Sequence, residues 1–223
     1  MELKVIARMK NDFTSKFAIP RQSGLVEGNI GKIVFEKAYS TPEAVRGLEG
    51  FSHIWLIWGF SQSSKQRWSA TVRPPRLGGN KRIGVFATRS PYRPNALGLS
   101  CVRLVCIEKG ALIVDGADLM DNTPIYDIKP YLSFTDCRPD ASDGFANEVF
   151  KNNLTVKADE KLLKILPFDK QKTLIKILEQ NPIPAYHNDK NRIYGFKFWD
   201  TEVKFSVQDN ILTLLDIKKS HDK

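Results

Sequence analysis

The chain has 223 residues, 42% of them hydrophobic, and a formal net charge of +9 at pH 7. This length is enough for one large or two small domains with buried cores. The charge favours an anionic partner such as nucleic acid. The longest apolar run, around Ile54 to Phe60, is too short to span a membrane, and the N-terminus lacks a signal-peptide pattern. We therefore expect a cytoplasmic protein without membrane contact.

The N-terminal segment reads as two short strands separated by a polar loop. Leu3 to Met9 alternates between apolar and polar residues, as a half-buried strand does, and Ile30 to Phe35 is a second predicted strand. The loop between them is sharpest at Pro20 to Gly24. A helix is predicted to begin at Thr41-Pro42, with threonine as its N-cap, and to end at Gly50.

Phe51 to Phe60 is a nearly continuous apolar run that predicts a fully buried strand. Its Trp55 and Trp58 would suit base stacking, but core packing is the better interpretation for aromatic side chains in such a run.

The stretch from Thr71 to Ser100 is unusual in composition. It contains six basic residues, four prolines and four glycines, and it lacks Asp and Glu. Much of it is therefore not regular helix, and only Ile83 to Thr88 reads as a short buried strand. We interpret the stretch as a rigid cationic loop system for an anionic partner.

Three more strands are predicted after this stretch, at Leu99 to Ile107, Ala111 to Gly116 and Ile125 to Tyr131, the last as an edge strand closed by proline. Short strands with irregular charged connections favour an all-β barrel over a βαβ sheet. We therefore expect a mainly β protein whose N-terminal β-barrel domain covers residues 1–135.

The remainder, residues 136–223, is predicted to form a small α+β domain. A linker is expected near Phe134 to Asn147, where Asp, Ser, Ala and Gly gather. The predicted elements that follow are two helices, Asp159 to Leu166 and Asp169 to Gln180, and three strands, Ile193 to Trp199, Glu202 to Gln208 and Ile211 to Asp216. The dipeptides Asp200-Thr201 and Asp209-Asn210 suit tight hairpins between these strands.

The cysteines do not form the sequence pattern of a disulfide framework. There are three, Cys101, Cys106 and Cys137, and their spacing is not that of metal ligands. We expect inert thiols in a reducing compartment, and no metal site.

Four loops concentrate side chains that packing does not require: Pro20 to Gly24, Ser61-Gln62, Arg89 to Gly98 and Asp118 to Asp127. Each lies beside a predicted strand end. Strand ends at one mouth of a barrel come together, and small-molecule sites collect there. The spacing alone does not identify a ligand.

A set of motifs spread over nearly the whole chain carries a family resemblance. They are Arg46 to Glu49, Phe51-Ser52-His53, Thr71 to Asn80, Gly84 to Ser90, Arg93-Pro94-Asn95, Asp127 to Tyr131 and, in the second domain, Pro182 to Tyr186. Together these segments resemble the TrmO family, also known as YaeB-like or TsaA-like proteins, of the bacterial type with a C-terminal domain.

The resemblance implies an S-adenosylmethionine-dependent tRNA methyltransferase that acts on N6 of the threonylcarbamoyl-modified adenosine 37, beside the anticodon. It implies a homodimer with the cofactor in the β-barrel domain. The matched cofactor positions are Arg21, Gln22, Ser23, Ser61, Gln62, Arg89, Leu99, Asp118, Leu119, Met120 and Asp121. Asp118 and Asp121 suit a cationic sulfonium, although both residues also suit a purely structural turn. Arg89 suits the cofactor carboxylate, with a solvated surface arginine as the alternative.

The N6 amine needs a hydrogen-bond acceptor that takes its proton. Asn95, Tyr126 and Asp127 are the candidates, and the sequence does not choose among them. Contact with tRNA phosphates is expected from Arg73, Arg76, Lys81, Arg82 and Arg93. Lysines of the second domain add phosphate contacts or cover solvated helix faces. A non-catalytic RNA-binding barrel and a methyltransferase for another substrate are the alternative functions.

Four positions depart from the bacterial family pattern. They are Ser61 for His or Asp, Ala96 for Pro, Asn122 for Gly and Ile183 for Arg. Asn122 fits because asparagine accepts a positive φ.

Overall fold

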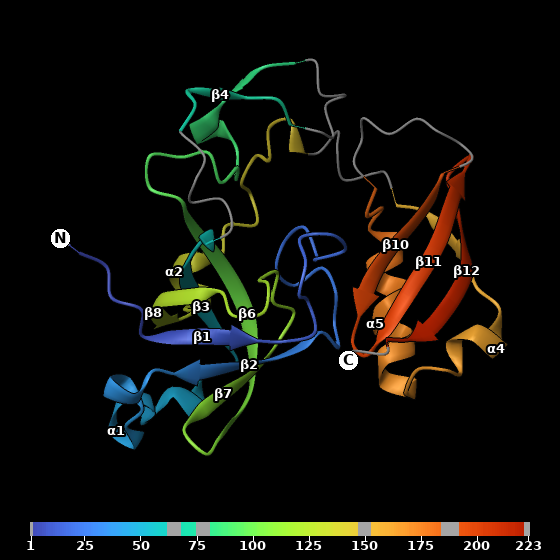
Figure 1. Ribbon diagram of the computed structural model, residues 1–223. Helices are drawn as coiled ribbons and strands as arrows, with labels where there is room; N and C mark the ends of the chain where they lie inside the picture. The colour runs from blue at the N-terminus through green and yellow to red at the C-terminus, as the bar shows by residue number, and fades with distance from the viewer. Residues whose placement is uncertain (1, 62–67, 75–80, 147–152, 184–191, 221–223) are drawn as a thin grey trace.

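The computed structural model describes residues 2–61, 68–74, 81–146, 153–183 and 192–220. These residues form a closed β-barrel from the N-terminal part of the chain and, beside it, a smaller sheet covered by helices (Figure 1). The predicted fold class, a β-barrel followed by an α+β domain, is confirmed.

The barrel is closed by antiparallel strands in the order β1-β2-β7-β6-β3-β8. The strand bounds are β1 Ala7–Lys10, β2 Ile30–Phe35, β3 His53–Gly59, β6 Leu97–Glu108, β7 Ala111–Asp115 and β8 Pro124–Pro130. Side chains that point inward, among them Met9, Ile33 and Leu56, are fully buried. The predicted first strand begins too early, since Leu3 is exposed and pairing with β2 starts at Ala7.

Strand β8 is not the edge strand that its prolines suggested. It pairs with β1 on one side and with β3 on the other, and so closes the barrel. Pro124 and Pro130 lie at its two ends, where a missing N–H interrupts few ladder bonds. The closure of the barrel therefore overrides the local signal for an edge.

A short arm stands above the barrel and contains β4 (Thr71–Val72), β5 (Ile83–Gly84) and the 3₁₀ helix η5 (Val85–Ala87) (Figure 1). The predicted strand from Ile83 to Thr88 is therefore wrong beyond Gly84. The backbone N–H of Thr88 and its hydroxyl both donate to the carbonyl of Val85, and this turn ends the strand.

Short helices fill the connection between β2 and β3: η1 Lys37–Tyr39, α1 Pro42–Val45 and η2 Leu48–Gly50. The Thr41 side chain accepts a hydrogen bond from the Glu43 N–H, as predicted for an N-cap. The helix ends earlier than Gly50 because Gly47 adopts a φ of 86°, which a helix does not tolerate.

The C-terminal sheet has the order β10-β11-β12-β9. Its elements and the preceding helix are α2 Ser133–Asp136, β9 Thr155–Lys157, α4 Glu160–Leu163, α5 Phe168–Glu179, β10 Ile193–Phe198, β11 Thr201–Gln208 and β12 Ile211–Lys219. Both helices and all three strands of the prediction are present. Strand β9 was missed because three residues carry too little pattern.

The two hairpins of this sheet have two-residue loops. Asp209 and Asn210 have φ angles of 49° and 62°, as predicted for a tight hairpin. The other loop is Trp199-Asp200, one residue earlier than predicted, because Thr201 already pairs with Phe198.

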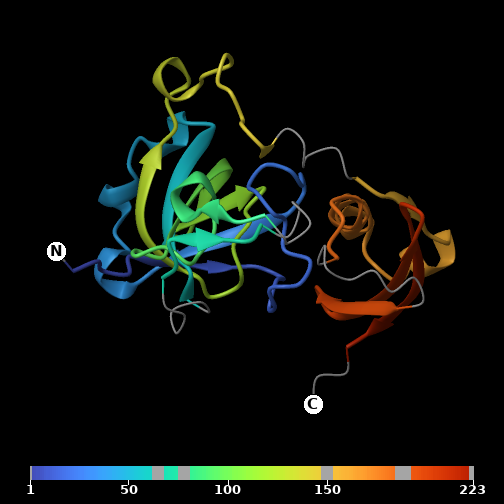
Figure 2. The same ribbon diagram turned by 90° about the horizontal axis from the view of Figure 1, so that it is seen from above.

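The loop from Asn11 to Gly28 connects β1 and β2 but packs into the C-terminal domain. Figures 1 and 2 both show it between the barrel and α5. Phe13, Ala18 and Val26 are buried in one cluster with the C-terminal core. The Phe17 ring packs on Tyr194, Phe196 and Phe205, with ring centroids 6.0–6.5 Å apart. This shared core joins the two domains.

Candidate functional site

Three of the four predicted loops meet at one end of the barrel. The Arg89 guanidinium donates a hydrogen bond to the Gln22 side chain, which joins the loop after η5 to the loop after β1. The Ser23 backbone N–H donates to the Asp118 carboxylate, and Arg89 also lies close enough to interact with that carboxylate electrostatically. The structure thus brings Gln22, Ser23, Arg89 and Asp118 together.

Asp118 follows β7 and lies against β6. Its Oδ1 accepts a hydrogen bond of 2.5 Å from the Ser100 hydroxyl. Burial raises the pKa of this carboxyl group, while the hydrogen bonds of Ser100 and Ser23 and the charge of Arg89 act in the opposite direction. A carboxylate that has lost water through burial favours the binding of a cation, because the cation replaces the lost hydration.

The turn from Asp118 to Asp121 is fastened to the residues that follow β1. The Asp121 carboxylate accepts from the Asn11 N–H at 3.1 Å and lies 3.6 Å from the Lys10 ammonium. The Asn11 amide donates to the Leu119 carbonyl at 2.7 Å. Leu119 is buried and Met120 is half-buried beside it. Asp121 thus shapes the turn, whatever else it contacts.

Asn122 completes this turn with a φ of 63°. The positive φ is the one anticipated from asparagine in place of glycine.

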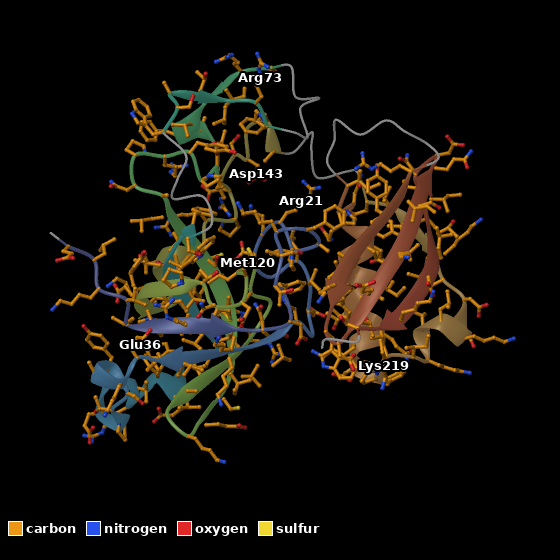
Figure 3. The ribbon with its side chains drawn as sticks, in the orientation of Figure 1. Arg21, Glu36, Arg73, Met120, Asp143 and Lys219 are labelled. Carbon is orange, nitrogen blue, oxygen red and sulfur yellow. The ribbon has the colours of Figure 1, made fainter. Side chains whose placement is uncertain are left out.

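Arg21 points away from this group. Its guanidinium donates to the backbone carbonyls of Asn181 (2.7 Å) and Ile183 (3.2 Å), just beyond the C-terminal end of α5. Figure 3 shows Arg21 between the two domains, whereas Met120 lies on the barrel. Arg21 therefore ties the predicted cofactor loop to the second domain.

Leu99 and Ser61 are exposed at the same end of the barrel strands, and Leu99 lies within β6. The other residue of the Ser61-Gln62 pair, Gln62, lies outside the described residues.

The three candidate proton acceptors occupy different surroundings. The Asp127 carboxylate accepts from the Ile128 N–H and pairs with Lys129 at 2.9 Å. Asn95 is exposed, and its carbonyl accepts from the Leu97 N–H.

Tyr126 lies in a β-bulge. Ile57 pairs with Asp127 and Trp58 with Ile125, so Tyr126 is the extra residue on β8. Its phenol lies directly over Gly59, where a Cβ atom would approach the hydroxyl oxygen to 2.5 Å. Bulges re-aim side chains and are common beside active sites.

The arm carries exposed cations. Arg73, Lys81 and Arg82 are exposed, and Arg82 donates to the Thr71 hydroxyl at 3.0 Å. Figure 3 shows Arg73 at the end of the arm away from the barrel. Arg93 is different, because its guanidinium donates to the carbonyls of Thr88 (2.6 Å) and Val85 (3.3 Å) and so holds its own loop. Arg76 lies outside the described residues.

Two exposed aromatic residues, which no sequence motif singled out, accompany these cations. Trp68 is 55% exposed and Phe86 is 73% exposed, with the Arg93 guanidinium 5.7 Å from the Phe86 ring centre. The interleaving of aromatic residues with cations, which is typical of surfaces that bind nucleic acid, is the sequence pattern that could have identified them.

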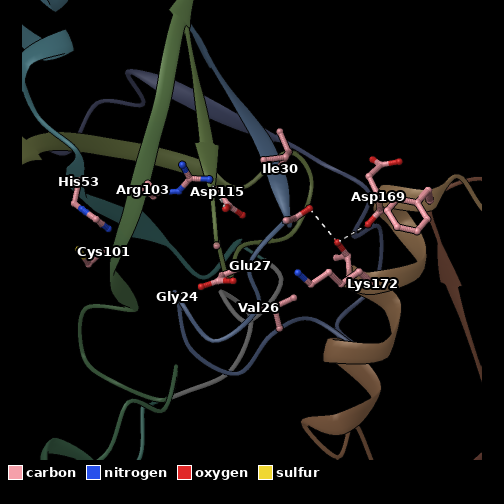
Figure 4. Close-up of a pocket in the computed structure, with 14 residues that line it drawn as sticks. Gly24, Val26, Glu27, Ile30, His53, Cys101, Arg103, Asp115, Asp169 and Lys172 are labelled. Atoms are coloured by element: carbon pink, nitrogen blue, oxygen red, sulfur yellow. Dashed lines mark hydrogen bonds and ion pairs between the residues drawn. The ribbon is translucent and has the colours of Figure 1, made fainter. Parts of the chain in front are cut away.

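A separate cavity of about 540 Å³ lies between the barrel and α5, and its lining includes none of the predicted cofactor residues. Figure 4 shows Arg103 and Asp115 on the barrel side, across from Lys172 and Asp169 on the helix. Arg103 pairs with Asp115 Oδ2 at 2.8 Å, while the buried Oδ1 has no hydrogen-bond partner among the described residues. Residues scattered over five segments of the chain form this cavity, so no local sequence pattern points to it.

Two further findings concern the described part of the chain. It contains no group of three or more His, Cys, Asp and Glu side chains that could hold a metal ion. Within the same residues, helices long and apolar enough to cross a membrane are absent.

Comparisons with known proteins agree with the resemblance seen in the sequence. Family models described as the tRNA-methyltransferase O N-terminal domain and the TrmO C-terminal domain match residues 8–137 and 150–220. The tRNA (adenine(37)-N6)-methyltransferase of Escherichia coli is 40% identical over 93% of this chain and 94% of its own length.

A relative from Pseudomonas aeruginosa, named as a putative S-adenosylmethionine-dependent methyltransferase RcsF, is 37% identical over 95% of both chains. A crystal structure of TrmO from the same species superposes with a TM-score of 0.79 at 30% identity, covering 98% of each chain.

Proposed function

The chain belongs to the TrmO family, and from this premise we propose that it is an S-adenosylmethionine-dependent tRNA methyltransferase acting on N6 of adenine 37. The observation that supports this most strongly is the convergence of Gln22, Ser23, Arg89 and Asp118 at one end of the barrel. These segments are far apart in sequence, and packing does not require their polar side chains.

The donors of this group fit the proposed cofactor chemically. S-adenosylmethionine supplies a methyl group activated by a positively charged sulfur and also carries a carboxylate and an ammonium group. Asp118 offers an anion to the cationic part. Arg89 offers a guanidinium to the carboxylate, held in place by its bond to Gln22.

The remaining work of the protein is alignment and exclusion of water, because methyl transfer is an in-line displacement. The N6 nitrogen is a poor nucleophile because its lone pair is delocalised into the ring. An acceptor that takes the N6 proton would help. Tyr126, whose phenol lies over Gly59 at the end of β3, is favoured over Asp127, which is paired with Lys129.

For the substrate we propose adenosine 37 already modified by a threonylcarbamoyl group, as the family resemblance implies. That group adds a carboxylate, for which the basic residues between Thr71 and Ser100 offer partners. The exposed Arg73, Lys81 and Arg82 are proposed to contact the tRNA backbone. The base leaves the anticodon-loop stack to reach the cofactor.

We further propose that the active form is a homodimer in the cytoplasm, with the barrel domain as residues 1–135 and residues 136–223 as a second domain that contacts tRNA. The exposed apolar side chains Phe86 and Leu99, 73% and 57% exposed, suit a subunit contact near the cofactor end. Light scattering on the purified chain tests the dimer, and a monomer at assay concentration would contradict it.

Calorimetry with S-adenosylmethionine, followed by a methyl-transfer assay on total tRNA, tests the function. We expect saturable cofactor binding and transfer to tRNA. Absence of cofactor binding would favour a non-catalytic RNA-binding barrel. Binding without transfer to any tRNA would favour another substrate.

A further inference from the structure

A chain of two buried hydrogen bonds ends on Asp118. The Trp58 indole N–H donates to the Ser100 hydroxyl oxygen at 2.9 Å, and the Ser100 hydroxyl donates to Asp118 Oδ1 at 2.5 Å. Trp58 is 7% exposed and Ser100 is 1% exposed, while Asp118 retains contact with solvent. The chain therefore runs from the barrel core to a carboxylate at the surface of the proposed cofactor site.

The barrel strands fix the geometry of these two hydrogen bonds. In the pairing of β3 with β6, Trp58 lies opposite Gly98 and Leu56 lies opposite Ser100. The indole packs directly against Gly98, where a Cβ atom would come within 2.2 Å of the Trp58 ring. Only glycine leaves room for the ring, so the position of the indole N–H depends on this residue pair.

The donor and acceptor capacities of the side chains fix the direction of both hydrogen bonds. The indole nitrogen donates and does not accept, so the Ser100 oxygen is its acceptor. The single Ser100 proton is then directed to Asp118, whose carboxylate is an acceptor when ionised. Bonds aligned in this way polarise one another, and a hydrogen bond to a charged group is stronger than one between neutral groups.

Three other groups of the described residues face Asp118. They are the Ser23 N–H, the Asp118 N–H and the charge of Arg89. The nearest acidic residue of the same turn, Asp121, is engaged by Asn11 and Lys10. None of these groups comes from the barrel core, so Ser100 supplies the only described support from that side.

We propose that Trp58 and Ser100 are positioning residues of the cofactor site, which hold the Asp118 carboxylate as a fixed anion facing the positively charged part of S-adenosylmethionine. This inference rests on the proposed function. The two residues touch neither cofactor nor substrate, and they act through Asp118 alone.

Calorimetric titration of S-adenosylmethionine into the full-length protein, repeated over a range of pH, tests the proposal. Ser100→Ala should weaken binding about 10- to 100-fold at neutral pH, the usual range for a lost bond to a charged group. Trp58→Phe keeps an aromatic ring on Gly98 but removes the indole donor, and should weaken binding about 2- to 10-fold.

The pH dependence separates positioning from a general structural role. The Ser100 hydrogen bond lowers the pKa of Asp118. Without that bond, the carboxylate becomes protonated at a higher pH, so the acidic loss of cofactor affinity should move towards neutrality in Ser100→Ala. A loss of the same factor at every pH would overturn the proposal, as would wild-type affinity.

Two controls complete the test. Trp55→Phe removes an equivalent bond on the same strand, from the Trp55 indole N–H to Asp136 at 2.8 Å, and should leave cofactor affinity unchanged. Ser100→Thr restores the hydroxyl and should restore the wild-type pH profile. Equal losses in Trp55→Phe and Trp58→Phe would contradict the proposal. Wild-type protein that fails to bind the cofactor would instead contradict the proposed function.

Discussion

The two ends of the segment from Thr71 to Ser100 are built in opposite ways. Around Gly98 and Ser100 the chain is a barrel strand, with side chains fixed by buried hydrogen bonds. At the other end, residues 71–74 and 81–84 form an arm of two-residue strands on which Arg73, Lys81 and Arg82 are exposed. The first end is suited to recognise a small molecule by orientation, and the second to recognise a polyanion by charge.

This difference predicts that the two ends respond to different perturbations. Binding at the strand end should depend on single hydrogen bonds and on pH. Binding at the arm should depend on the number of cations and on salt. The following substitutions test this contrast.

Asp118→Asn should have the largest effect on the cofactor end. Loss of the anion should weaken S-adenosylmethionine binding by about 30-fold or more, since it leaves the cationic group unpaired. The methyl-transfer rate at limiting cofactor should fall in parallel. Calorimetry measures the affinity, and binding at wild-type strength would remove Asp118 from the site.

The same substitution should stabilise the fold. Burial raises the pKa of Asp118 above its value in the unfolded chain. The folded state therefore holds this proton more tightly, and the stability that the group contributes is present at low pH and lost as pH rises through the folded pKa. At neutral pH the charge of the buried Asp118 carboxylate lowers the free energy of unfolding, and Asp118→Asn removes that charge. Each 1 kcal/mol gained in the free energy of unfolding raises the melting temperature by about 2–4 °C. A lower melting temperature at neutral pH would contradict this assignment.

Arg89→Ala should weaken cofactor binding about tenfold, because it removes both a charge and the anchor of the Gln22 side chain. Arg89→Lys keeps the charge but loses the planar fork, and should recover only part of the affinity. If both variants bind like the wild type, the loop after η5 does not contact the cofactor.

Phe17→Ala tests whether the C-terminal domain supports the cofactor loop. The ring packs on Tyr194, Phe196 and Phe205, in the same loop as Gln22 and Ser23. We expect a loss of stability of about 2–4 kcal/mol and a smaller, few-fold loss of cofactor affinity. The matched control is Phe134→Ala, since Phe134 is 84% exposed. Unchanged cofactor affinity in Phe17→Ala would show that the loop keeps its conformation without this contact.

The arm should respond to salt instead. Arg73→Ala combined with Lys81→Ala should reduce the slope of log affinity for tRNA against log salt by about 0.7–0.9 for each lost phosphate contact. Cofactor affinity should stay at the wild-type value. The control pair Lys32→Ala and Lys37→Ala removes two exposed cations outside the arm. An equal change in both pairs would mean that the arm has no special role.

The sequence predicted the parts of the fold that local pattern determines. Apolar alternation located most barrel strands, and the identity of Asn122 anticipated its positive φ of 63°. The prediction of β8 as an edge strand was wrong. A proline removes one backbone hydrogen-bond donor, whereas closure of the barrel depends on the pairing of all strands together.

The site was predictable only as a set of loops. The contacts that hold it join residues far apart in sequence, such as Trp58 and Ser100, 42 residues apart, and Arg89 and Gln22, 67 residues apart. No periodicity or spacing encodes such pairs. The direction of Arg21 towards the second domain and the bulge at Tyr126 therefore emerged only from the three-dimensional structure.

The most direct test of this account is methyl transfer from S-adenosylmethionine to one defined tRNA, prepared with and without the threonylcarbamoyl group at adenosine 37. Nucleoside mass spectrometry identifies the methylated position for the wild-type protein and for Asp118→Asn. We predict a methyl group on N6 of the modified adenosine 37 with the wild type, and strongly reduced transfer with the variant. Methylation at another position, or equal transfer by both proteins, would contradict the account.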